Sequence, residues 1–556
     1  MTDTRTSPAP PGARPRKRTG LAALAALSGL LAGGAALAVA ELAAGWLRPQ
    51  AGPVVAVGGA VIDRTPAAVK DWAVRRFGTD DKLVLQLGIC AVLALGAALL
   101  GLLSRGHRRT AAAGVLAVGA IGAVAAVGRP DSTGPSDALP SLLGAVAGAL
   151  LLYGLAGRMR PPAPRGRGVR GEDAGAAGPA TGGDDDPDAS PPPGWDRRGF
   201  VVLAGSAAVL SAATGVLGRR LAALGGRDAA ASRAAVTLPA PASPAPPVPR
   251  GAAPRIPGLS PFTTPNSSFY RVDTALVVPR VDAGDWRLRV HGKGVTRPRT
   301  LTFADLLRRP LVERDITLTC VSNEVGGPNV GNARWLGVRL ADLLAECGVR
   351  PPSRGGPADQ LVARSVDGMT LGTPVEDVMD GRDALLAVGM NGEPLPFAHG
   401  FPVRMVVPGL YGYVSACKWI TEIELTTFDA YDAYWVRRGW ARRAPVKTQA
   451  RIDTPRPFAR PRSGTVMVAG VAWAQHRGID RVEVRVDDGP WTEARLAAED
   501  SRDTWRQWSF PWQAEPGTHT LTVRATDRTG AVQTDRRTRT VPDGASGRHS
   551  VVVTVE

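Results

Sequence analysis

The stretch that constrains the fold most reads Asp315-Ile-Thr-Leu-Thr-Cys320-Val-Ser-Asn323-Glu324-Val-Gly326-Gly327. Its first part is β-type up to Cys320, and its second part is a turn rich in Gly and Asn. A strand that delivers a lone cysteine to such a turn can present a thiolate to a ligand or a metal ion. Taken alone, the pattern also fits a small apolar cysteine buried at a strand end.

A second informative stretch runs from Met390 to Trp419 and is bent repeatedly by Gly and Pro. His399, Arg404 and Lys418 interrupt its otherwise apolar path. Donor groups of this kind beside exposed backbone suit a phosphate-bearing ligand. The alternative is that Arg404 and Lys418 are ordinary solvated strand residues.

Together these stretches resemble the sulfite oxidase family of molybdopterin enzymes. The motif T-L-x-C-x-x-N ends at Asn323, and A-R-W-x-G-x-x-L passes through Trp335. The run N-G-E-P-L-P, H-G-x-P-x-R, P-G and K-W follows in the same order between Asn391 and Trp419. The resemblance extends from about residue 255 to the end of the sequence.

The resemblance implies an α+β domain that binds a molybdenum–molybdopterin cofactor. Cys320 stands at the position of the metal ligand, and a soft thiolate fits molybdenum. The residues implied to hold the cofactor are Asn323, Trp335, His399, Arg404 and Lys418, the last three at the pterin's phosphate. The cofactor implies two-electron oxygen-atom transfer.

Two positions depart from the family pattern. Trp440 follows Trp435-Val-Arg-Arg-Gly where the family has a Tyr beside the metal, and Arg271 is the nearest candidate for the substrate-binding Arg. Cys320, Arg271 and Trp440 are therefore the candidate catalytic residues. The substrate remains open between a small oxo-anion and a sulfoxide-type compound, as does the direction of the reaction.

The first 220 residues contain apolar runs close to the length of about 20 residues that spans a bilayer. We expect membrane helices at about Leu21–Trp46, Val84–Leu103, Ala111–Val127, Leu139–Leu155 and Phe200–Leu217.

Basic residues set the expected orientation. The cluster that ends at Arg18 and the loop Arg105–Arg109 are expected in the cytoplasm, so five crossings place the rest of the chain outside. This predicts a multi-pass cell-membrane protein with its catalytic domain on the extracytoplasmic side. Arg197-Arg198 also resembles a twin-arginine export signal; the alternative is ordinary positive-inside flanking.

After about residue 450 the pattern changes to strands alone. Arg481–Val486 alternates strictly, Asp488-Gly489 marks a turn, and residues 521–525 repeat the period of two. This tail resembles the immunoglobulin-like dimerisation domain of the family, which implies a homodimer.

The predicted fold class is multi-domain: a transmembrane helical bundle, an α+β sulfite-oxidase-like molybdopterin-binding domain and a C-terminal immunoglobulin-like β-sandwich. The expected boundaries are a cytoplasmic basic tail (1–18), four spans (19–157), a disordered cytoplasmic linker (158–198), a fifth span or twin-arginine-like anchor (199–220), an Ala/Pro-rich tether (221–254), the catalytic domain (255–447) and the dimerisation domain (448–556).

The composition of the sequence limits the classes of partner and cofactor that we expect. The net charge is +17, but the Arg residues are dispersed and no basic stripe is interleaved with aromatics, so no nucleic-acid partner is expected. None of the six His residues lies in a predicted span and C-x-x-C-H does not occur, so no haem is predicted in this chain. Besides a small-molecule substrate and the lipid bilayer, we expect a separate electron-transfer partner, either a cytochrome or a quinone-linked subunit.

Two other classes of function compete with this interpretation. The same scaffold could be a catalytically inactive binding or structural module, which Trp440 and the long helical extension favour. The helical bundle could instead be a transporter or sensor that carries an external domain. The bundle lacks the membrane-centre ionisable residues expected on an ion path, which disfavours that class.

Overall fold

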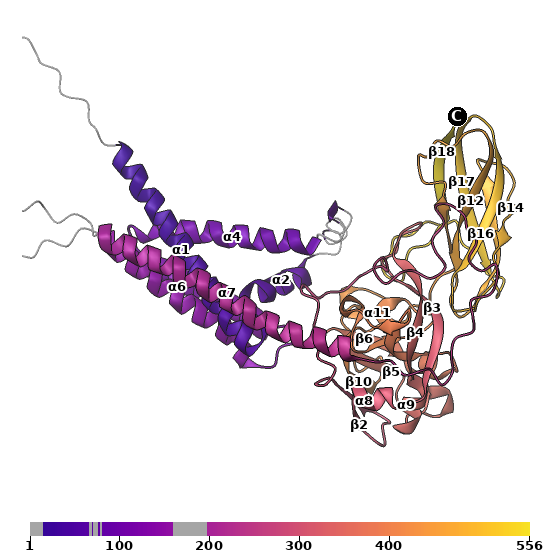
Figure 1. The fold of residues 1–556 in the computed structure, drawn as a ribbon, viewed down its shortest axis with the longest axis horizontal. Coiled ribbons are helices and arrows are strands. Elements are labelled where there is room, and N and C mark those ends of the chain that lie inside the picture. The colour runs from indigo at the N-terminus through magenta and orange to yellow at the C-terminus, as the bar shows by residue number, and fades with distance from the viewer. Residues whose placement is uncertain (1–14, 66–68, 70–75, 78–80, 130, 160–196) are drawn as a thin grey trace, which may run out of the picture. The chain divides into compact units, whose positions relative to one another are not determined.

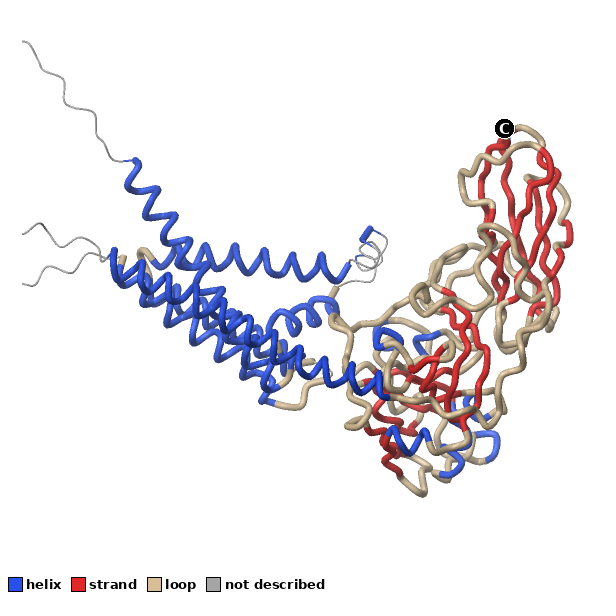
Figure 2. Tube along the Cα trace, viewed as in Figure 1, coloured by secondary structure: helices blue, strands red, loops and turns tan. Residues whose placement is uncertain are grey.

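The computed structural model describes residues 15–65, 69, 76–77, 81–129, 131–159 and 197–556 (Figures 1 and 2). The chain divides into two compact units, Met1–Leu224 and Gly225–Glu556. Most of the expected tail (1–18) and of the expected linker (158–198) lies outside the described residues.

The first unit is helical. Its helices are α1 (Pro15–Leu47), α2 (Pro53–Arg64), α4 (Asp81–Ser104), α5 (Arg108–Val127), α6 (Leu139–Arg158) and the first part of α7 (Arg197–Ala235), with short turns η1 (Pro49–Ala51) and η3 (Pro135–Ala138). Five helical stretches among the described residues are long and apolar enough to cross a membrane, at Gly20–Leu47, Leu83–Ser104, Arg108–Val127, Pro135–Arg158 and Arg197–Gly218. These are the five segments predicted from hydropathy.

Small residues let these helices pack closely. A Cβ atom on Gly101 of α4 would lie 2.2 Å from the carbonyl oxygen of Ala25 in α1. A Cβ atom on Gly144 of α6 would lie 2.3 Å from the carbonyl oxygen of Ala36 in α1. The glycines are therefore required where the backbones of α4 and α6 meet α1.

An ion-pair cluster fixes the loops that follow α1 and α5. Asp131, whose side chain is 1% exposed, pairs with Arg48 at 2.8 Å and with Arg129 at 2.8 Å. Arg48 also reaches Asp137 at 3.1 Å, and Arg129 donates to the carbonyl oxygen of Val55 in α2. The cluster gives the charged residues of these loops partners within the unit.

The expected extended tether (221–254) is wrong in its first part, because α7 continues to Ala235. This region is rich in Ala, the best helix former, before Pro becomes frequent. Within the second unit, Arg233 donates to the carbonyl oxygens of Leu395 (2.8 Å) and Pro394 (2.6 Å). Further along, Ser243 forms a parallel bridge with Val312, so this segment is held against a strand.

One mixed and one antiparallel sheet form the first part of the second unit (Figure 2). The first sheet has the order β2-β1-β10-β5-β6, with only β1 and β10 parallel, and the second has the order β3-β4-β7-β8, with β9 also paired to β7. Their bounds are β1 (Arg287–Gly292), β2 (Arg299–Thr302), β3 (Leu311–Thr319), β4 (Val330–Arg339), β5 (Gln360–Ser365), β6 (Thr370–Pro374), β7 (Leu385–Met390), β8 (Glu393–Pro394), β9 (Arg404–Val406) and β10 (Ile420–Thr426).

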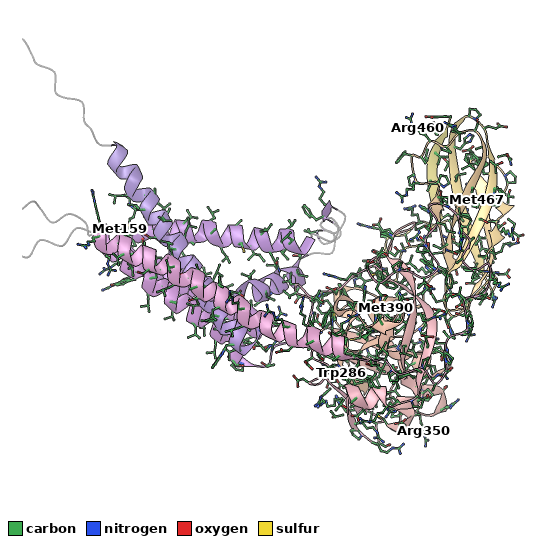
Figure 3. All side chains as sticks on the ribbon, in the orientation of Figure 1. Met159, Trp286, Arg350, Met390, Arg460 and Met467 are labelled. Carbon is green, nitrogen blue, oxygen red and sulfur yellow. The ribbon has the colours of Figure 1, made fainter. Side chains whose placement is uncertain are left out.

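Short helices and turns connect these strands. They are α8 (Phe303–Leu307), α9 (Leu340–Glu346), α10 (Val375–Met379), α11 (Gly412–Ser415), η4 (Pro352–Arg354), η5 (Phe397–His399) and η6 (Val436–Arg438). A capping box opens α8: Thr302 and Asp305 exchange side-chain to backbone hydrogen bonds. Trp286 and Met390, both labelled in Figure 3, are among the buried side chains of the core between the sheets.

The C-terminal part of the unit consists of two four-stranded antiparallel sheets, which we call the C-terminal sheets. Their orders are β11-β12-β16-β15 and β14-β13-β17-β18. The bounds are β11 (Gln449–Thr454), β12 (Gly464–Trp473), β13 (Ile479–Val486), β14 (Thr492–Glu493), β15 (Arg495–Leu496), β16 (Arg506–Ala514), β17 (Gly517–Asp527) and β18 (His549–Val555). One apolar core joins both sheets, with fully buried Val468 and Trp508 from one and Val482, Leu521 and Val553 from the other.

The strand β3 receives hydrogen bonds along both edges. One edge pairs with β4 over its whole length. Along the other edge, Thr317 N donates to Asp503 O (2.9 Å), and the Gln475 amide donates to Thr317 O (3.0 Å). The loops of the C-terminal sheets therefore cover an edge that would otherwise expose unpaired backbone groups.

We expect Thr317→Val to destabilise this junction. The Thr317 hydroxyl donates to Asn332 Oδ1 (3.0 Å) and accepts from Trp505 N (2.7 Å), and both partners are buried. Valine has the same shape but leaves these groups unpaired, at a cost of about 1–3 kcal/mol. Differential scanning calorimetry of the full chain in detergent should show a lower Tm. Thr465→Val, at an exposed position on β12, is the matched control, and equal Tm values for the two variants would contradict the prediction.

Candidate active site

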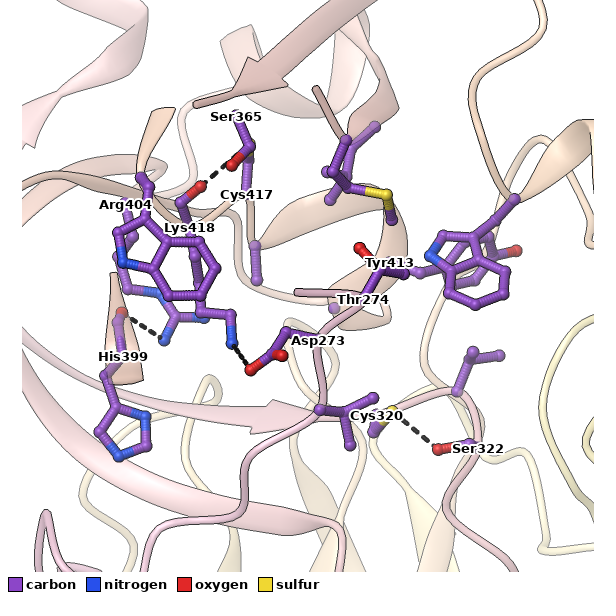
Figure 4. Close-up of a pocket in the computed structure, with 18 of the residues that line it drawn as sticks. Asp273, Thr274, Cys320, Ser322, Ser365, His399, Arg404, Tyr413, Cys417 and Lys418 are labelled. Carbon is purple, nitrogen blue, oxygen red and sulfur yellow. Dashed lines mark hydrogen bonds and ion pairs between the residues drawn. The ribbon is translucent and has the colours of Figure 1, made fainter. Parts of the chain in front are cut away.

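A cavity of about 160 Å³ lies where β3, α11 and the loop after η5 converge (Figure 4). It brings together side chains that are far apart in the sequence. Its lining includes Tyr270, Asp273, Cys320, Ser322, His399, Arg404, Tyr413, Cys417, Lys418, Trp435 and Trp440. Figure 4 shows His399, Arg404 and Lys418 on one side, Cys320 and Ser322 on another, and Asp273 between them.

Cys320 lies directly after β3, as its sequence pattern predicts. Its backbone N–H donates to Asn329 O (3.0 Å), which closes the turn, and its Sγ lies 3.0 Å from the hydroxyl oxygen of Ser322. Burial raises the pKa of the Cys320 thiol, while the hydrogen bonds from Ser322 and the charge of Lys418 act in the opposite direction. The sulfur is therefore a thiol until a cation displaces its proton.

Arg404, the first residue of β9, places a guanidinium inside the protein. It is 6% exposed, and burial lowers its pKa to about 10. One Nη donates to His399 O (3.2 Å), and the guanidinium lies 4.9 Å from the ring centre of Trp335. Its buried Nε has no hydrogen-bond partner among the residues that the structure describes. A buried cation with an unused donor fits a site for an anionic ligand.

Lys418 and Asp273 form an ion pair at the cavity. The Lys418 ammonium lies 2.8 Å from the Asp273 carboxylate and donates to Ala398 O (3.3 Å). The next residue, Trp419, has a φ of +51°, a conformation that few side chains adopt, and its indole N–H donates to Phe397 O (2.9 Å). This strained residue turns the chain so that Lys418 faces the loop that carries His399.

His399 is held in its neutral form. Its Nε2 lies 3.1 Å from Asn266 O, to which the ring N–H donates. Burial and the neighbouring charge of Arg404 lower its pKa to about 4. At neutral pH the imidazole therefore offers one acceptor and one committed donor.

Five of the eight residues named from the sequence line the cavity: Cys320, His399, Arg404, Lys418 and Trp440. The other three are placed nearby with different contacts. Asn323 accepts from Asn329 N (2.8 Å) and so shapes the turn after Cys320. The indole N–H of Trp335 donates to Ile316 O (3.1 Å) in the core, and Arg271 pairs with Asp273 at 3.3 Å.

The lining residues that the sequence motifs do not predict include Tyr270, Asp273, Tyr413 and Trp435. Tyr270 and Asp273 flank Arg271 in a segment without helix or strand. Burial, and then the charge of Cys320, raise the pKa of Tyr270 above its usual value. The ring of Tyr413 packs 5.6 Å from that of Trp440, which in turn packs 6.2 Å from Trp435. Aromatic density in the sequence around these positions is the one signal that could have pointed to them.

The C-terminal sheets brace the turn that follows Cys320. Arg451 of β11 donates to Gly327 O (2.8 Å), and Gln475 donates to the hydroxyl of Thr319 (2.9 Å). Gly326 has a φ of +79°, and a Cβ atom there would lie 2.2 Å from the His549 ring. The turn is therefore packed too tightly to move independently of these sheets.

The donor set fits a molybdenum–molybdopterin cofactor. The cavity offers the Cys320 sulfur, and no group of three or more His, Cys, Asp or Glu that could hold a metal occurs among the described residues. A single thiolate suits a metal that brings its remaining sulfur ligands with an organic group. The guanidinium of Arg404, whose Nε donates no hydrogen bond within the described structure, suits the phosphate of such a group.

Comparisons with known proteins agree with this chemistry. Residues 275–435 match the family model described as the oxidoreductase molybdopterin binding domain. The chain is 32% identical to mitochondrial sulfite oxidase of Mus musculus over 49% of this chain and 58% of that protein. It is 31% identical to sulfite oxidase of Gallus gallus over 49% of this chain and 68% of that protein. The solved structure of sulfane dehydrogenase SoxCD from Paracoccus pantotrophus covers 53% of this chain and 84% of its own, at 27% identity and a TM-score of 0.46.

The class defined by the fold and the cavity is thus an oxidoreductase with a molybdopterin-binding domain. The chain spans a little over half the length of the mammalian sulfite oxidases it matches. It belongs to the sulfite oxidase-like family of molybdopterin oxidoreductases, whose cofactor is molybdenum–molybdopterin.

We expect Gly326→Ala to lower the molybdenum content of the purified protein. The substitution places a Cβ atom against His549 and imposes a positive φ, so the turn carrying Cys320 must shift. Gly355→Ala is the matched control, because Gly355 has a φ of +76° and open space around it. Elemental mass spectrometry of both variants checks the prediction, which fails if they retain equal molybdenum.

His549 should make the protein less stable as the pH falls. Its Nδ1 accepts from Ile452 N (3.0 Å), and burial lowers its pKa to about 4. Because the unfolded chain takes up this proton at higher pH, stability decreases from about pH 6.5 down to pH 4. Tm measured across this range should fall less in His549→Gln, which keeps an acceptor but cannot titrate. Parallel curves for both proteins would exclude this role.

Proposed function

We propose that this protein is a membrane-anchored oxidoreductase that transfers an oxygen atom, with two electrons, to or from a neutral sulfoxide-type substrate. The observation that carries the choice of substrate is the carboxylate of Asp273 at the cavity, already paired with Lys418 and Arg271. An oxo-anion that entered the cavity would be repelled by the negative charge of this carboxylate.

The residue roles follow from the contacts. Cys320 would bind the molybdenum, and His399, Arg404 and Lys418 would hold the phosphate end of the pterin, as their grouping on one side of the cavity supports. When bound, the cofactor supplies the two-electron oxygen-atom chemistry. The chain's own side chains orient the substrate and limit the access of water.

The balance of charge favours a neutral substrate. Arg404 and Lys418 supply two positive charges, Asp273 and Asp367 supply two negative charges, and the phosphate of the cofactor adds more negative charge. Near Cys320 the wall is aromatic, with Tyr413, Trp435 and Trp440. Burying an uncompensated oxo-anion there is costly, whereas the polar oxygen of a sulfoxide needs only hydrogen-bond donors.

The helical unit supports the proposed location. We assign its five apolar helices to the bilayer and the second unit to the extracytoplasmic side, following the basic residues that flank the first three spans. Electrons would be exchanged with a separate cytochrome or quinone-linked subunit. We assign no haem to this chain, following the absence of a haem-attachment motif in the sequence.

We also propose that the C-terminal sheets are an immunoglobulin-like dimerisation domain. Their shared apolar core, with Trp508 buried between two antiparallel sheets, supports that architecture. Light scattering of the full chain in detergent, corrected for bound detergent, would show twice the protomer mass if the assignment is right.

The test of function uses the full chain purified from its native membrane. We expect near-stoichiometric molybdenum and reduction of methyl p-tolyl sulfoxide by reduced methyl viologen, with kcat/KM on the order of 100-fold above that for sulfite oxidation by ferricyanide. Cys320→Ser should lose turnover, because the metal loses its protein ligand. Cys347→Ser, which removes a buried thiol outside the cavity, is the control.

Asp273→Asn provides the second arm of this test. Removing the carboxylate should shift the preference toward sulfite. Faster turnover of sulfite than of the sulfoxide by the unmodified protein would refute the neutral-substrate proposal, and bound molybdenum without turnover of either would favour the inactive module.

A further inference from the structure

We infer that Tyr270 is the hydrogen-bond donor that contacts the oxygen atom of the substrate. The inference rests on the proposed function and adds to it a specific residue. It comes from the placement of the Tyr270 phenol at the cavity and from the absence of a hydrogen-bond partner for its hydroxyl among the described residues.

Aromatic packing holds the Tyr270 ring in place. The ring stacks on Phe269, with centroids 5.1 Å apart and planes 22° apart. Phe269 packs edge-on against Trp335 at 6.0 Å and against His399 at 5.6 Å. The side chain is thus anchored to the wall that also supports Arg404, although its own segment has no regular secondary structure.

The hydroxyl group faces the region of the cavity next to Cys320. Tyr270 and Cys320 both line the cavity. A Cβ atom built on Gly412, another lining residue, would lie 3.9 Å from the Tyr270 hydroxyl oxygen and 3.7 Å from Thr319 O. The phenol therefore ends between the start of α11 and the end of β3, where the metal-ligand cysteine follows.

The hydroxyl groups of the two tyrosines that line the cavity differ in their hydrogen bonds. The Tyr413 hydroxyl donates to Ala441 O at 2.6 Å. The Tyr270 hydroxyl has no hydrogen-bond partner in the part of the chain that the structure describes, although Cys320 and Arg404 line the same cavity. The Tyr270 side chain is partly buried and lines the cavity, so its hydroxyl can donate to an acceptor supplied by a ligand there.

A phenol has the chemistry that a neutral oxygen-bearing substrate requires. Its ordinary pKa is about 10, so it carries its proton at neutral pH and donates without adding charge. The oxygen of a sulfoxide accepts such a bond, whereas the nearby carboxylate of Asp273 can only accept. A donor fixed by packing gains most where negative charge develops on the oxygen during transfer.

The experiment compares Tyr270→Phe with Tyr411→Phe. Tyr411 is a buried tyrosine of the same region that does not line the cavity, and its hydroxyl accepts from Lys447 N at 3.4 Å. Both variants are assayed as full chains in detergent, with molybdenum content measured first and rates expressed per molybdenum. Methyl p-tolyl sulfoxide is the substrate, and reduced methyl viologen is the electron donor.

We expect Tyr270→Phe to retain molybdenum and to lose about 100-fold in kcat, with a smaller change in KM, as when one donor to a developing negative charge is removed. Tyr411→Phe should keep its kcat. A merely structural role for Tyr270 would lower Tm or molybdenum content and leave kcat per molybdenum unchanged, and that result would overturn the inference.

A binding measurement separates this inference from the proposed function. Tetramethylene sulfone, a neutral non-reacting oxygen ligand, is titrated while the tryptophan fluorescence of the protein is followed, since Trp419, Trp435 and Trp440 line the cavity. The Kd should rise about fivefold to tenfold in Tyr270→Phe alone, the size of one neutral hydrogen bond. If the unmodified protein fails to reduce the sulfoxide but shows this shift, the proposed reaction fails and Tyr270 remains the donor. Equal Kd values in all three proteins would overturn the assignment of Tyr270.

Discussion

Hydrogen bonds along both edges of β3 are the constraint on which the candidate site depends. The strand ends at Cys320, so any slip in its register would move the thiol by a full residue. Its pairing with β4 alone would leave one edge open, but the segment around Ser243 and the loops around Gln475 and Asp503 cover it. The position of the thiol is thus set by residues on both sides of it in the sequence, each more than seventy positions away.

The two cations near this strand, Lys418 and Arg404, differ in how far their charges are neutralised. The cation of Lys418 is neutralised by Asp273, whereas Arg404 is buried beneath an aromatic wall with only a carbonyl oxygen as its hydrogen-bond partner in the described structure. Burial of an incompletely solvated guanidinium is unfavourable for the protein without its ligand. An anionic group that binds Arg404 relieves this cost, so cofactor binding and stability of the fold are coupled.

The sequence motifs indicate the thiol and the cationic residues because each lies beside the end of a strand or a glycine turn, as Cys320 follows β3 and His399 precedes Gly400. Motifs fix spacing but not the direction of a side chain: Asn323 accepts a hydrogen bond within the turn, and Trp335 donates one to the core while its ring lies 4.9 Å from the Arg404 guanidinium. Tyr270 could not be found in this way, since packing against Phe269 orients it. Hydropathy predicted the five apolar helices, but composition misjudged the tether, where an Ala-rich stretch prolongs α7.

The contact between Gly326 and His549 has a consequence for biosynthesis. The turn that presents the metal-ligand thiol comes off the ribosome more than two hundred residues before the imidazole against which it packs. Nascent chains fold as their segments emerge, and long-range contacts form last. The pocket therefore matures only after β18 has been translated, so insertion of the metal cofactor follows the synthesis of His549.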